Sequence, residues 1–469
     1  MDPSPSLVFG TDGWRDVIAD RFTVANVRLA AAAYAEHLLE RGAGRVVVGH
    51  DTRFGGDLFA GAAAGELAGH GLEVLLSDGY LPTPALSYAV KHYRAGGGVM
   101  LTASHNPPHY QGFKLKGPYG GTATDEIYRD VARRVGAARP VGGGDAGKIE
   151  RFDVREAYYR ALEGVLDMDV LANARGHILH DAMGGAACGW MTGFASSRGL
   201  SLQIEPVHGE PHPLFYGVNP EPIAGNLADT RERMREADAW FAAATDGDGD
   251  RLGVVLPGGT FFDAHQIFAV LLDELSLDGR PGSVVKTFTV SRVVERLAAS
   301  RHRPVVETPV GFKYIVDAML SQDVLIGGEE SGGIGVAGHI PERDGIVNAL
   351  LLVQGVGRSG ASLPERFAAI ERETGWRHAY DRLDLHLSGN ALKDRVLAEL
   401  RDPPARFGGR AVTSVERLDG VKLNLADDAW LLYRASGTEP VLRIYCEAPT
   451  SEDVRDLLDA ARAWTDTLG

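Results

Sequence analysis

Residues 45–53 read RVVVGHDTR, a short β-branched run that ends in a polar turn, and a stretch with helical periodicity follows over residues 58–67. Residues 177–185 (HILHDAMGG) and 283–287 (SVVKT) begin two further segments of the same layout. Strand-turn-helix units of this kind build mostly parallel sheets covered by helices, with ligand sites at the carboxyl ends of the strands. Their spacing of roughly a hundred residues predicts three related α/β domains with mixed, mostly parallel sheets.

The C-terminal part of the chain has a different periodicity. Leucine or valine alternates with polar residues over 383–387 and 421–425, and residues 451–461 have the pattern of a closing helix. Alternation at period two indicates half-buried, mostly antiparallel strands. We therefore expect a smaller α+β domain at the C-terminus. The expected domain bounds are 1–150, 151–257, 258–368 and 369–469.

Composition and charge restrict the functional class. Apolar residues are 44% and charged residues 24% of the 469, which is ordinary globular usage. The formal net charge of −15 argues against a nucleic-acid partner and against an anionic membrane surface, so an anionic substrate would need a local basic site. With two cysteines, no apolar run of membrane-spanning length and no signal-like N-terminus, the sequence predicts a cytoplasmic protein without disulfides.

The most specific local pattern is residues 245–251, TDGDGDR, in which three aspartates alternate with glycines. Glycines allow a turn tight enough for the three carboxylates to converge, and oxygen-only ligands suit a hard divalent cation. An EF-hand is excluded because its sixth position would be Arg251 and its twelfth Pro257. The pattern predicts a Mg²⁺ site that borrows a ligand from elsewhere; the alternative is a solvated acidic turn.

A serine follows another apolar run, in residues 102–108, TASHNPP. Ser104, with His105 beside it, is a candidate nucleophile or phosphate carrier, although Ser and Asn before Pro are also ordinary turn residues. No Gly-x-Ser-x-Gly elbow surrounds Ser104, which disfavours an acyl hydrolase.

Two further loops carry polar groups among glycines. Residues 327–333, GGEESGG, offer carboxylates and a hydroxyl to sugar hydroxyls, and the alternative is a flexible loop. Residues 434–440, RASGTEP, with Arg443 beyond them, combine a cation, hydroxyls and flexible backbone N–H groups, as a phosphate-binding loop does. An exposed connection between two strands would look similar.

Taken together, these four motifs resemble the α-D-phosphohexomutases, because they occur in that family's order and at about its spacing. The opening residues 9–15, FGTDGWR, are also similar to the start of that family. The resemblance covers the whole chain and implies three related α/β domains and a C-terminal α+β domain around a central cleft.

The resemblance also implies roles for the reacting groups. Ser104 would carry the transferable phosphoryl group, and Asp246, Asp248 and Asp250 would hold Mg²⁺ together with an oxygen of the phosphoserine. Lys114 matches the family position for acid/base work, with His105 and Arg15 beside it.

The remaining matched residues would bind the substrate. Glu329 and Ser331 would contact sugar hydroxyls, and the loop after Arg434 would grip the phosphate that is not transferred. The full set implied for substrate binding is Arg251, Lys286, Thr308, Gly311, Lys313, Glu329, Ser331, Arg434, Ser436, Gly437, Thr438 and Arg443. The basic members of this set, with Arg15 and Lys114, would make the cleft locally positive.

The implied reaction is the interconversion of hexose 1-phosphate and hexose 6-phosphate through a hexose 1,6-bisphosphate, which would also act as activator. The implied partners are small sugar phosphates, with the chain a monomer or a homodimer. Residues 308–313 and 328–331 look closer to phosphoglucomutases than to phosphoglucosamine mutases, while a histidine common near Phe312 in dual glucose/mannose enzymes is lacking. Mannose phosphate as a second substrate, a glucosamine phosphate substrate, phosphatase activity and a non-catalytic sugar-phosphate binder stay open as alternatives.

Overall fold

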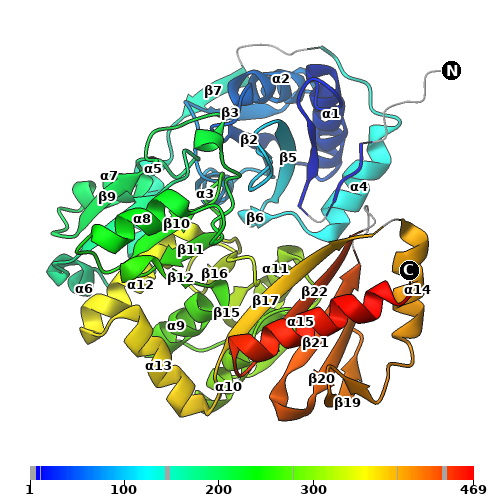
Figure 1. Cartoon of the computed structure of the whole chain (residues 1–469). Helices are drawn as coiled ribbons and strands as arrows, with labels where there is room; N and C mark the ends of the chain where they lie inside the picture. The colour runs from blue at the N-terminus through cyan, green and yellow to red at the C-terminus, as the bar shows by residue number, and fades with distance from the viewer. Residues whose placement is uncertain are drawn as a thin grey trace.

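Four β-sheets form the framework of the protein, and they follow one another along the chain (Figure 1). The computed structural model describes residues 7–10, 12–142, 148–277, 279–387, 389–435 and 441–468. The first sheet lies at the top of Figure 1, the second at the left, the third below and the fourth at the lower right. We refer to the four units built on these sheets as the first to fourth domains.

The first domain has a seven-stranded sheet in the order β1-β5-β4-β2-β3-β7, with β6 paired to β5. Its central strands are parallel, and β5 runs antiparallel to its neighbours. The strands are β1 (Trp14–Val17), β2 (Arg45–His50), β3 (Glu73–Ser77), β4 (Gly98–Leu101), β5 (Tyr110–Gly117), β6 (Gly121–Thr122) and β7 (Ile149–Phe152). The helices are α1 (Val24–Glu40), α2 (Gly56–Gly69), α3 (Thr83–His92) and α4 (Asp125–Val135).

The second domain has a five-stranded sheet in the order β12-β11-β10-β8-β9, parallel at β10-β8-β9 and antiparallel beyond. Its strands are β8 (His177–Asp181), β9 (Gln203–Val207), β10 (Ala242–Thr245), β11 (Leu252–Val255) and β12 (Phe261–Phe262). Its helices are α5 (Arg155–Glu163), α6 (Met168–Asn173), α7 (Trp190–Ser197) and α8 (Ala228–Glu236).

The third domain has a four-stranded sheet in the order β14-β13-β15-β16, with a parallel centre. Its strands are β13 (Ser283–Thr287), β14 (Val305–Thr308), β15 (Val324–Gly328) and β16 (Ile334–Val336). Its helices are α9 (Ala264–Leu277), α10 (Arg292–Ser300), α11 (Phe312–Ser321), α12 (Gly345–Ser359) and α13 (Leu363–Thr374). Asp344 caps α12 by accepting hydrogen bonds from the backbone N–H groups of Ile346 and Val347.

The fourth domain is an antiparallel sheet in the order β17-β22-β21-β20-β19-β18, on which α15 packs. Its strands are β17 (Ala379–His386), β18 (Arg406–Phe407), β19 (Arg410–Glu416), β20 (Val421–Leu425), β21 (Trp430–Ala435) and β22 (Val441–Ala448). Its helices are α14 (Asn390–Glu399) and α15 (Ser451–Asp466). The prediction of three α/β domains followed by an α+β domain is confirmed.

Three expected boundaries fall within secondary structure or within a sheet. Residue 150 lies in β7, which pairs with β3 and extends the first sheet to Phe152. Residue 257 precedes β12, which still pairs with β11 of the second sheet, and residue 368 lies in α13.

The expectation of a half-buried strand at 421–425 is wrong, because β20 is buried on both faces. Its polar residues face the third domain rather than solvent. Arg292 of α10 donates a 2.5 Å hydrogen bond to Asn424, and the Lys422 ammonium lies 4.2 Å from the centre of the Phe288 ring. Contact with another domain therefore buries the polar face of this strand.

The first three domains share an apolar core that the fourth does not join. One continuous cluster includes Val47 of β2, Phe194 of α7 and Leu350 of α12, whereas the fourth domain has a separate core around Leu431. A small aromatic cluster that contains Phe288 and Trp430 connects the third and fourth domains. The fourth domain is therefore the unit best able to move as a body.

Among the described residues no single helix is long and apolar enough to cross a membrane. The pair α12 and α13 passes by length and composition only, with a bend of 81° between the helices.

Candidate active site

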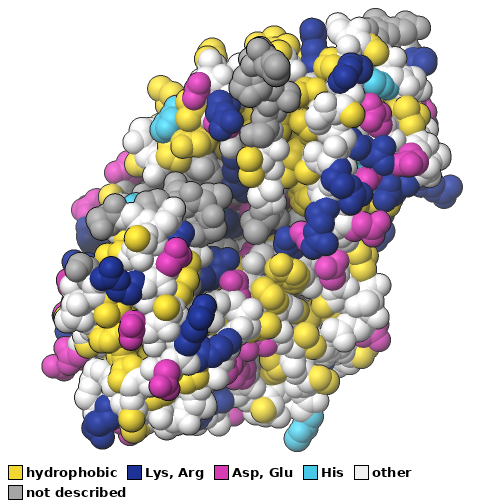
Figure 2. Space-filling model, turned by 90° about the vertical axis from the view of Figure 1, so that its right-hand side faces the viewer, with side chains coloured by type: hydrophobic (Ala, Val, Ile, Leu, Met, Phe, Trp, Pro, Cys, Tyr) yellow, Lys and Arg dark blue, Asp and Glu magenta, His cyan; other side chains and the backbone are white. Residues whose placement is uncertain are grey.

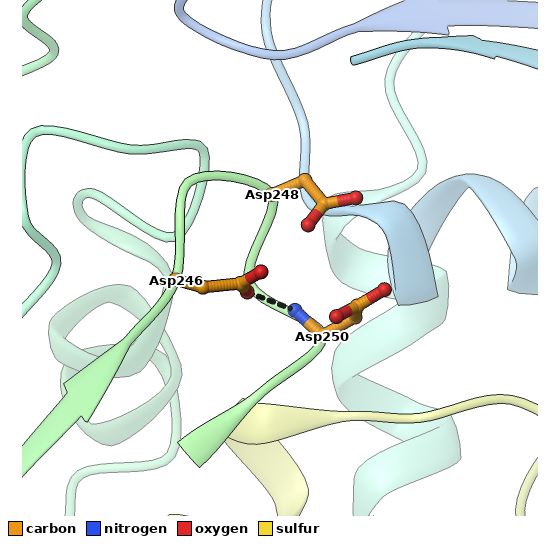
Figure 3. A group of neighbouring side chains, drawn as sticks. All are labelled: Asp246, Asp248 and Asp250. Atoms are coloured by element: carbon orange, nitrogen blue, oxygen red, sulfur yellow. Dashed lines mark hydrogen bonds between the residues drawn. The ribbon is translucent and has the colours of Figure 1, made fainter. Parts of the chain in front are cut away.

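The three aspartates lie on the turn between the antiparallel strands β10 and β11. Gly249 allows the turn with a φ of 76°, and the backbone N–H groups of Asp250 and Arg251 donate hydrogen bonds of 2.9 and 3.1 Å to Asp246 Oδ1. One carboxylate oxygen from each of Asp246, Asp248 and Asp250 lies within 4.8 Å of the others, and all three side chains are buried. Figure 3 shows the three carboxylates turned toward one space.

This arrangement fits a hard divalent cation. Oδ1 of Asp248 and Oδ1 of Asp250 are buried and have no hydrogen-bond partner within the described residues. Burial, together with the charge of the neighbouring carboxylates, raises the pKa of Asp246 well above its usual range and also raises the pKa of Asp250. Unpartnered oxygens and mutual repulsion both call for a cation, and the all-oxygen donor set suits Mg²⁺.

Two side-chain cations from other domains already reach the aspartates. Lys114 of β5 places its Nζ 2.8 Å from Asp248 Oδ2 and 3.0 Å from Asp12 Oδ2, and Arg343 places its Nη2 2.7 Å from Asp250 Oδ2. Burial lowers the pKa of Lys114, but the carboxylates of Asp12, Asp248 and Asp250 outweigh burial and hold that pKa above its usual value. Lys114 is therefore a charged, positioned donor.

Ser104 lies beyond β4, at the carboxyl end of the first sheet, and is 1% exposed. Its Oγ donates a 2.8 Å hydrogen bond to Asp246 Oδ2 and lies 3.4 Å from Nδ1 of His105. Its φ of 53° places the residue in the left-handed region, which is unfavourable for a side chain with a Cβ. Arg15 supports the same loop through a 2.7 Å hydrogen bond from Nη1 to Oδ1 of Asn106.

The Ser104 loop is held by Arg53, a buried residue that the sequence analysis did not single out. Arg53 donates hydrogen bonds of 2.6 to 3.1 Å to the backbone carbonyls of Ser104, Asn106, Pro107 and Tyr110. Its Nε donates to Asp51 Oδ2 at 3.1 Å. Both residues lie in the 45–53 stretch, but nothing in that pattern indicates that the guanidinium turns inward.

Arg343 is a second residue that the sequence analysis missed. It precedes α12 and contacts carboxylates from three domains: Asp12 at 2.7 Å, Asp250 at 2.7 Å and Glu329 at 3.6 Å. Burial raises the pKa of Glu329 to about 7, against the opposing charge of Arg343.

The loop after β15, which carries Glu329 and Ser331, lies beside the aspartate loop. Gly333 forms an isolated β-bridge with Arg251, and the backbone N–H of Leu252 donates a 3.1 Å hydrogen bond to the carbonyl of Gly332. The carboxyl ends of β4, β10 and β15 thus bring Ser104, the aspartates and Glu329 to one region.

Two lysines that were expected to bind the substrate instead pair with carboxylates of the protein. Lys286 makes ion pairs of 2.6 Å with Glu295 and 2.5 Å with Glu307. The Lys313 ammonium pairs with Asp125 of α4. Gly311 is the residue before α11, with a φ of 138°, and Thr308 ends β14.

The fourth-domain loop is described only at its edges. Arg434 donates a 2.9 Å hydrogen bond from Nε to Asp419 Oδ2, and Arg443 lies opposite it on β22. Ser436, Gly437 and Thr438 lie outside the described residues. Figure 2 shows a hollow between the upper lobe, which holds the first domain, and the lower lobe, with Lys and Arg side chains beside it.

Comparison with known families agrees with this architecture. Models of phosphoglucomutase/phosphomannomutase α/β/α domains I, II and III match residues 6–140, 156–259 and 263–373, and the model of the C-terminal domain matches residues 396–463. Four such domains in this order define a carbohydrate-related isomerase of the phosphohexomutase type. The chain belongs to the α-D-phosphohexomutase superfamily, the phosphoglucomutase/phosphomannomutase family.

Individual relatives cover nearly the whole chain. A phosphoglucomutase/phosphomannomutase of Thermococcus kodakarensis is 29% identical over 96% of this chain and 97% of its own length. A phosphoglucosamine mutase of Thermobifida fusca is 30% identical over 96% of each chain. The crystal structure of a candidate phosphomannomutase from Thermus thermophilus has 46% identity and a TM-score of 0.90, covering 99% of this chain and 100% of that one.

Proposed function

We propose that the protein interconverts hexose 1-phosphate and hexose 6-phosphate, with Ser104 as the carrier of the phosphoryl group. The observation that carries this proposal is the 2.8 Å contact between Ser104 Oγ and Asp246 within the buried aspartate cluster. A serine positioned against three carboxylates is suited to phosphoryl transfer, which depends on positioning and on neutralising oxygen charge.

Mg²⁺ is the proposed cofactor, held by Asp246, Asp248 and Asp250 beside Ser104. When bound, the ion neutralises charge on the phosphoryl oxygens during transfer. The chain's own cations add to this effect, because Lys114 and Arg343 already converge on the same carboxylates.

Ser104 takes part in two successive phosphoryl transfers, first as the donor and then as the acceptor. The bond between phosphorus and Ser104 Oγ breaks as the free hydroxyl of a hexose monophosphate bonds to phosphorus, which forms a hexose 1,6-bisphosphate. Burial holds the pKa of His105 well below its usual range, so its imidazole is neutral and accepts the hydroxyl proton. The charged Lys114 supplies a proton to Ser104 Oγ as that oxygen leaves phosphorus. After the sugar reorients, its other phosphate transfers to Ser104, and added bisphosphate serves as activator.

Substrate binding involves the third and fourth domains. Glu329 and Ser331 contact sugar hydroxyls, and the loop after Arg434 holds the phosphate that is not transferred. Because the fourth domain has its own core, its movement can close the site and exclude water, which would otherwise hydrolyse the phosphoserine.

We propose glucose phosphate as the preferred sugar, with mannose phosphate also accepted. Residues 308–313 and 328–331 support glucose phosphate, and the names of the Thermococcus and Thermus relatives support mannose phosphate as a second substrate. Glucosamine phosphate is the second candidate, because the Thermobifida relative is a phosphoglucosamine mutase.

Parallel assays on glucose 1-phosphate, mannose 1-phosphate and glucosamine 1-phosphate test the choice of sugar. The highest kcat/KM is expected for glucose 1-phosphate. If kcat/KM is about tenfold higher for glucosamine 1-phosphate, the proposed sugar is wrong but the proposed reaction stands. If none of the three sugars is turned over, both the proposed sugar and the proposed reaction are wrong.

A further inference from the structure

Lysine is rare in this chain, and one buried lysine differs from the others. Five of the eight lysines are buried: Lys114, Lys116, Lys286, Lys313 and Lys422. The first four each donate a hydrogen bond to a carboxylate. Lys422 of β20 makes no hydrogen bond through its ammonium within the described residues, although its side chain is only 6% exposed.

Two aromatic rings and one shared carboxylate surround the Lys422 ammonium. Its Nζ lies 4.2 Å from the centre of the Phe288 ring and 4.8 Å from that of Trp430. The carboxylate of Glu307 lies 3.7 Å away and is already bound by Lys286 at 2.5 Å. The amine is thus buried, and the one carboxylate that it contacts is held more closely by Lys286.

A cavity of about 420 Å³ between the third and fourth domains gives access to this amine. The charged groups that line it besides Lys422 are Lys286, Arg292, Glu295, Glu307 and Glu416. Burial and the charge of Lys286 lower the pKa of Lys422 to about 8, while the three glutamates oppose this shift. At pH 7.5 about a quarter of such amines are neutral, against about one in a thousand for an ordinary lysine.

We propose that Lys422 is a covalent modification site that accepts the acyl group of a small acyl phosphate. The cavity leads a small reagent to the amine, and the amide product is neutral, so it adds no negative charge beside three glutamates. The neutral Nζ attacks the acyl carbonyl carbon, the bond from that carbon to the phosphate oxygen breaks, inorganic phosphate leaves, and Nζ releases one proton to solvent.

Acylation would weaken the junction between the third and fourth domains. It removes the cation that lies against Phe288 and Trp430, and these rings belong to the cluster that connects the two domains. The proposal concerns a residue outside the aspartate site and stands independently of the proposed reaction.

Acetyl phosphate is the probe that tests the site, applied to the full chain with acetylation quantified by peptide mass spectrometry. The exposed lysines Lys91 and Lys148 serve as internal controls. We expect Lys422 to be acetylated at least tenfold faster than either control at pH 7.5. The rate at Lys422 should level off above pH 8, while the rates at the controls continue to rise.

Two further samples keep the result interpretable. Lys422→Arg keeps a cation between the rings and should lose acetylation at this position alone, with Lys91 and Lys148 unchanged. In denaturant the preference for Lys422 should vanish, because its cause is the folded environment. Acetylation of native Lys422 no faster than the exposed controls, or a preference that persists in denaturant, would overturn the proposal.

Discussion

Replacing Arg53 by lysine should slow the proposed reaction while leaving substrate affinity nearly unchanged. Arg53 donates to four backbone carbonyls of the Ser104 loop and to Asp51, and it contacts none of the residues proposed to bind the sugar. Lysine keeps the charge beside Asp51 but has three N–H donors on a single atom, so it cannot span the same carbonyls.

The magnitude follows from the lost contacts. At least two of five hydrogen bonds to a charged group are lost, each worth about 1.5 to 3 kcal/mol. Part of this loss lowers the free energy of unfolding, and part frees Ser104 from a left-handed conformation that costs about 1 to 2 kcal/mol to hold. Restoring the productive loop at a cost of about 1.4 to 2.7 kcal/mol corresponds to a fall in kcat of about ten- to a hundredfold.

The assay is a coupled measurement of kcat and KM on glucose 1-phosphate, alongside denaturant unfolding of each variant. Arg366→Lys is the matched control, because Arg366 is also buried and ion-paired, with Asp273 and Glu274. It should lose stability while keeping kcat. A folded Arg53→Lys variant with kcat within twofold of wild type would refute the role assigned to Arg53.

Three further changes test the metal, the phosphate loop and a buried histidine. Asp248→Asn should raise the Mg²⁺ concentration for half-maximal activity at least about tenfold, because one ligand charge is lost; unchanged activation would exclude Asp248 as a ligand. Arg434→Ala should raise KM by about ten- to a hundredfold, the equivalent of a charged hydrogen bond, and a KM within twofold would show that its loop does not hold phosphate. Burial would lower the pKa of His378, but Asp263 and Glu447 outweigh burial and raise that pKa to about 10. The stability that His378 adds is therefore complete below about pH 6.5 and is lost progressively as pH rises through 10. The difference in free energy of unfolding between wild type and His378→Gln should shrink over that range. A difference that does not change with pH would disprove the link between His378 protonation and stability.

Local patterns made the fold and the aspartate cluster predictable. The segments 45–50, 177–181 and 283–287 each contain two or three adjacent aliphatic residues before a polar turn, and the structure has a strand at each. The convergence of the aspartates depends on glycines within the same six residues, so it needs no information from the rest of the chain. Four motifs in one order then identified the family.

Features that depend on distant partners could not be predicted. Arg343 lies 331 residues from Asp12, and only the folded chain shows that the two meet. The sequence does not predict β7, because Glu150 and Arg151 are exposed and leave little apolar pattern. The burial of Lys422 requires the third domain to cover β20, and alternation within one strand carries no such information.

The most direct test of the proposed reaction is to map phosphate on the protein during turnover. Wild-type protein incubated with glucose 1,6-bisphosphate and Mg²⁺ should carry one phosphate, on Ser104, as read by intact mass and peptide mapping. Adding glucose 1-phosphate should discharge it into new bisphosphate. Ser104→Ala should remain folded, take up no phosphate and lose turnover. Phosphate mapped to another residue, together with an active Ser104→Ala variant, would contradict the assignment of Ser104 as the phosphoryl carrier.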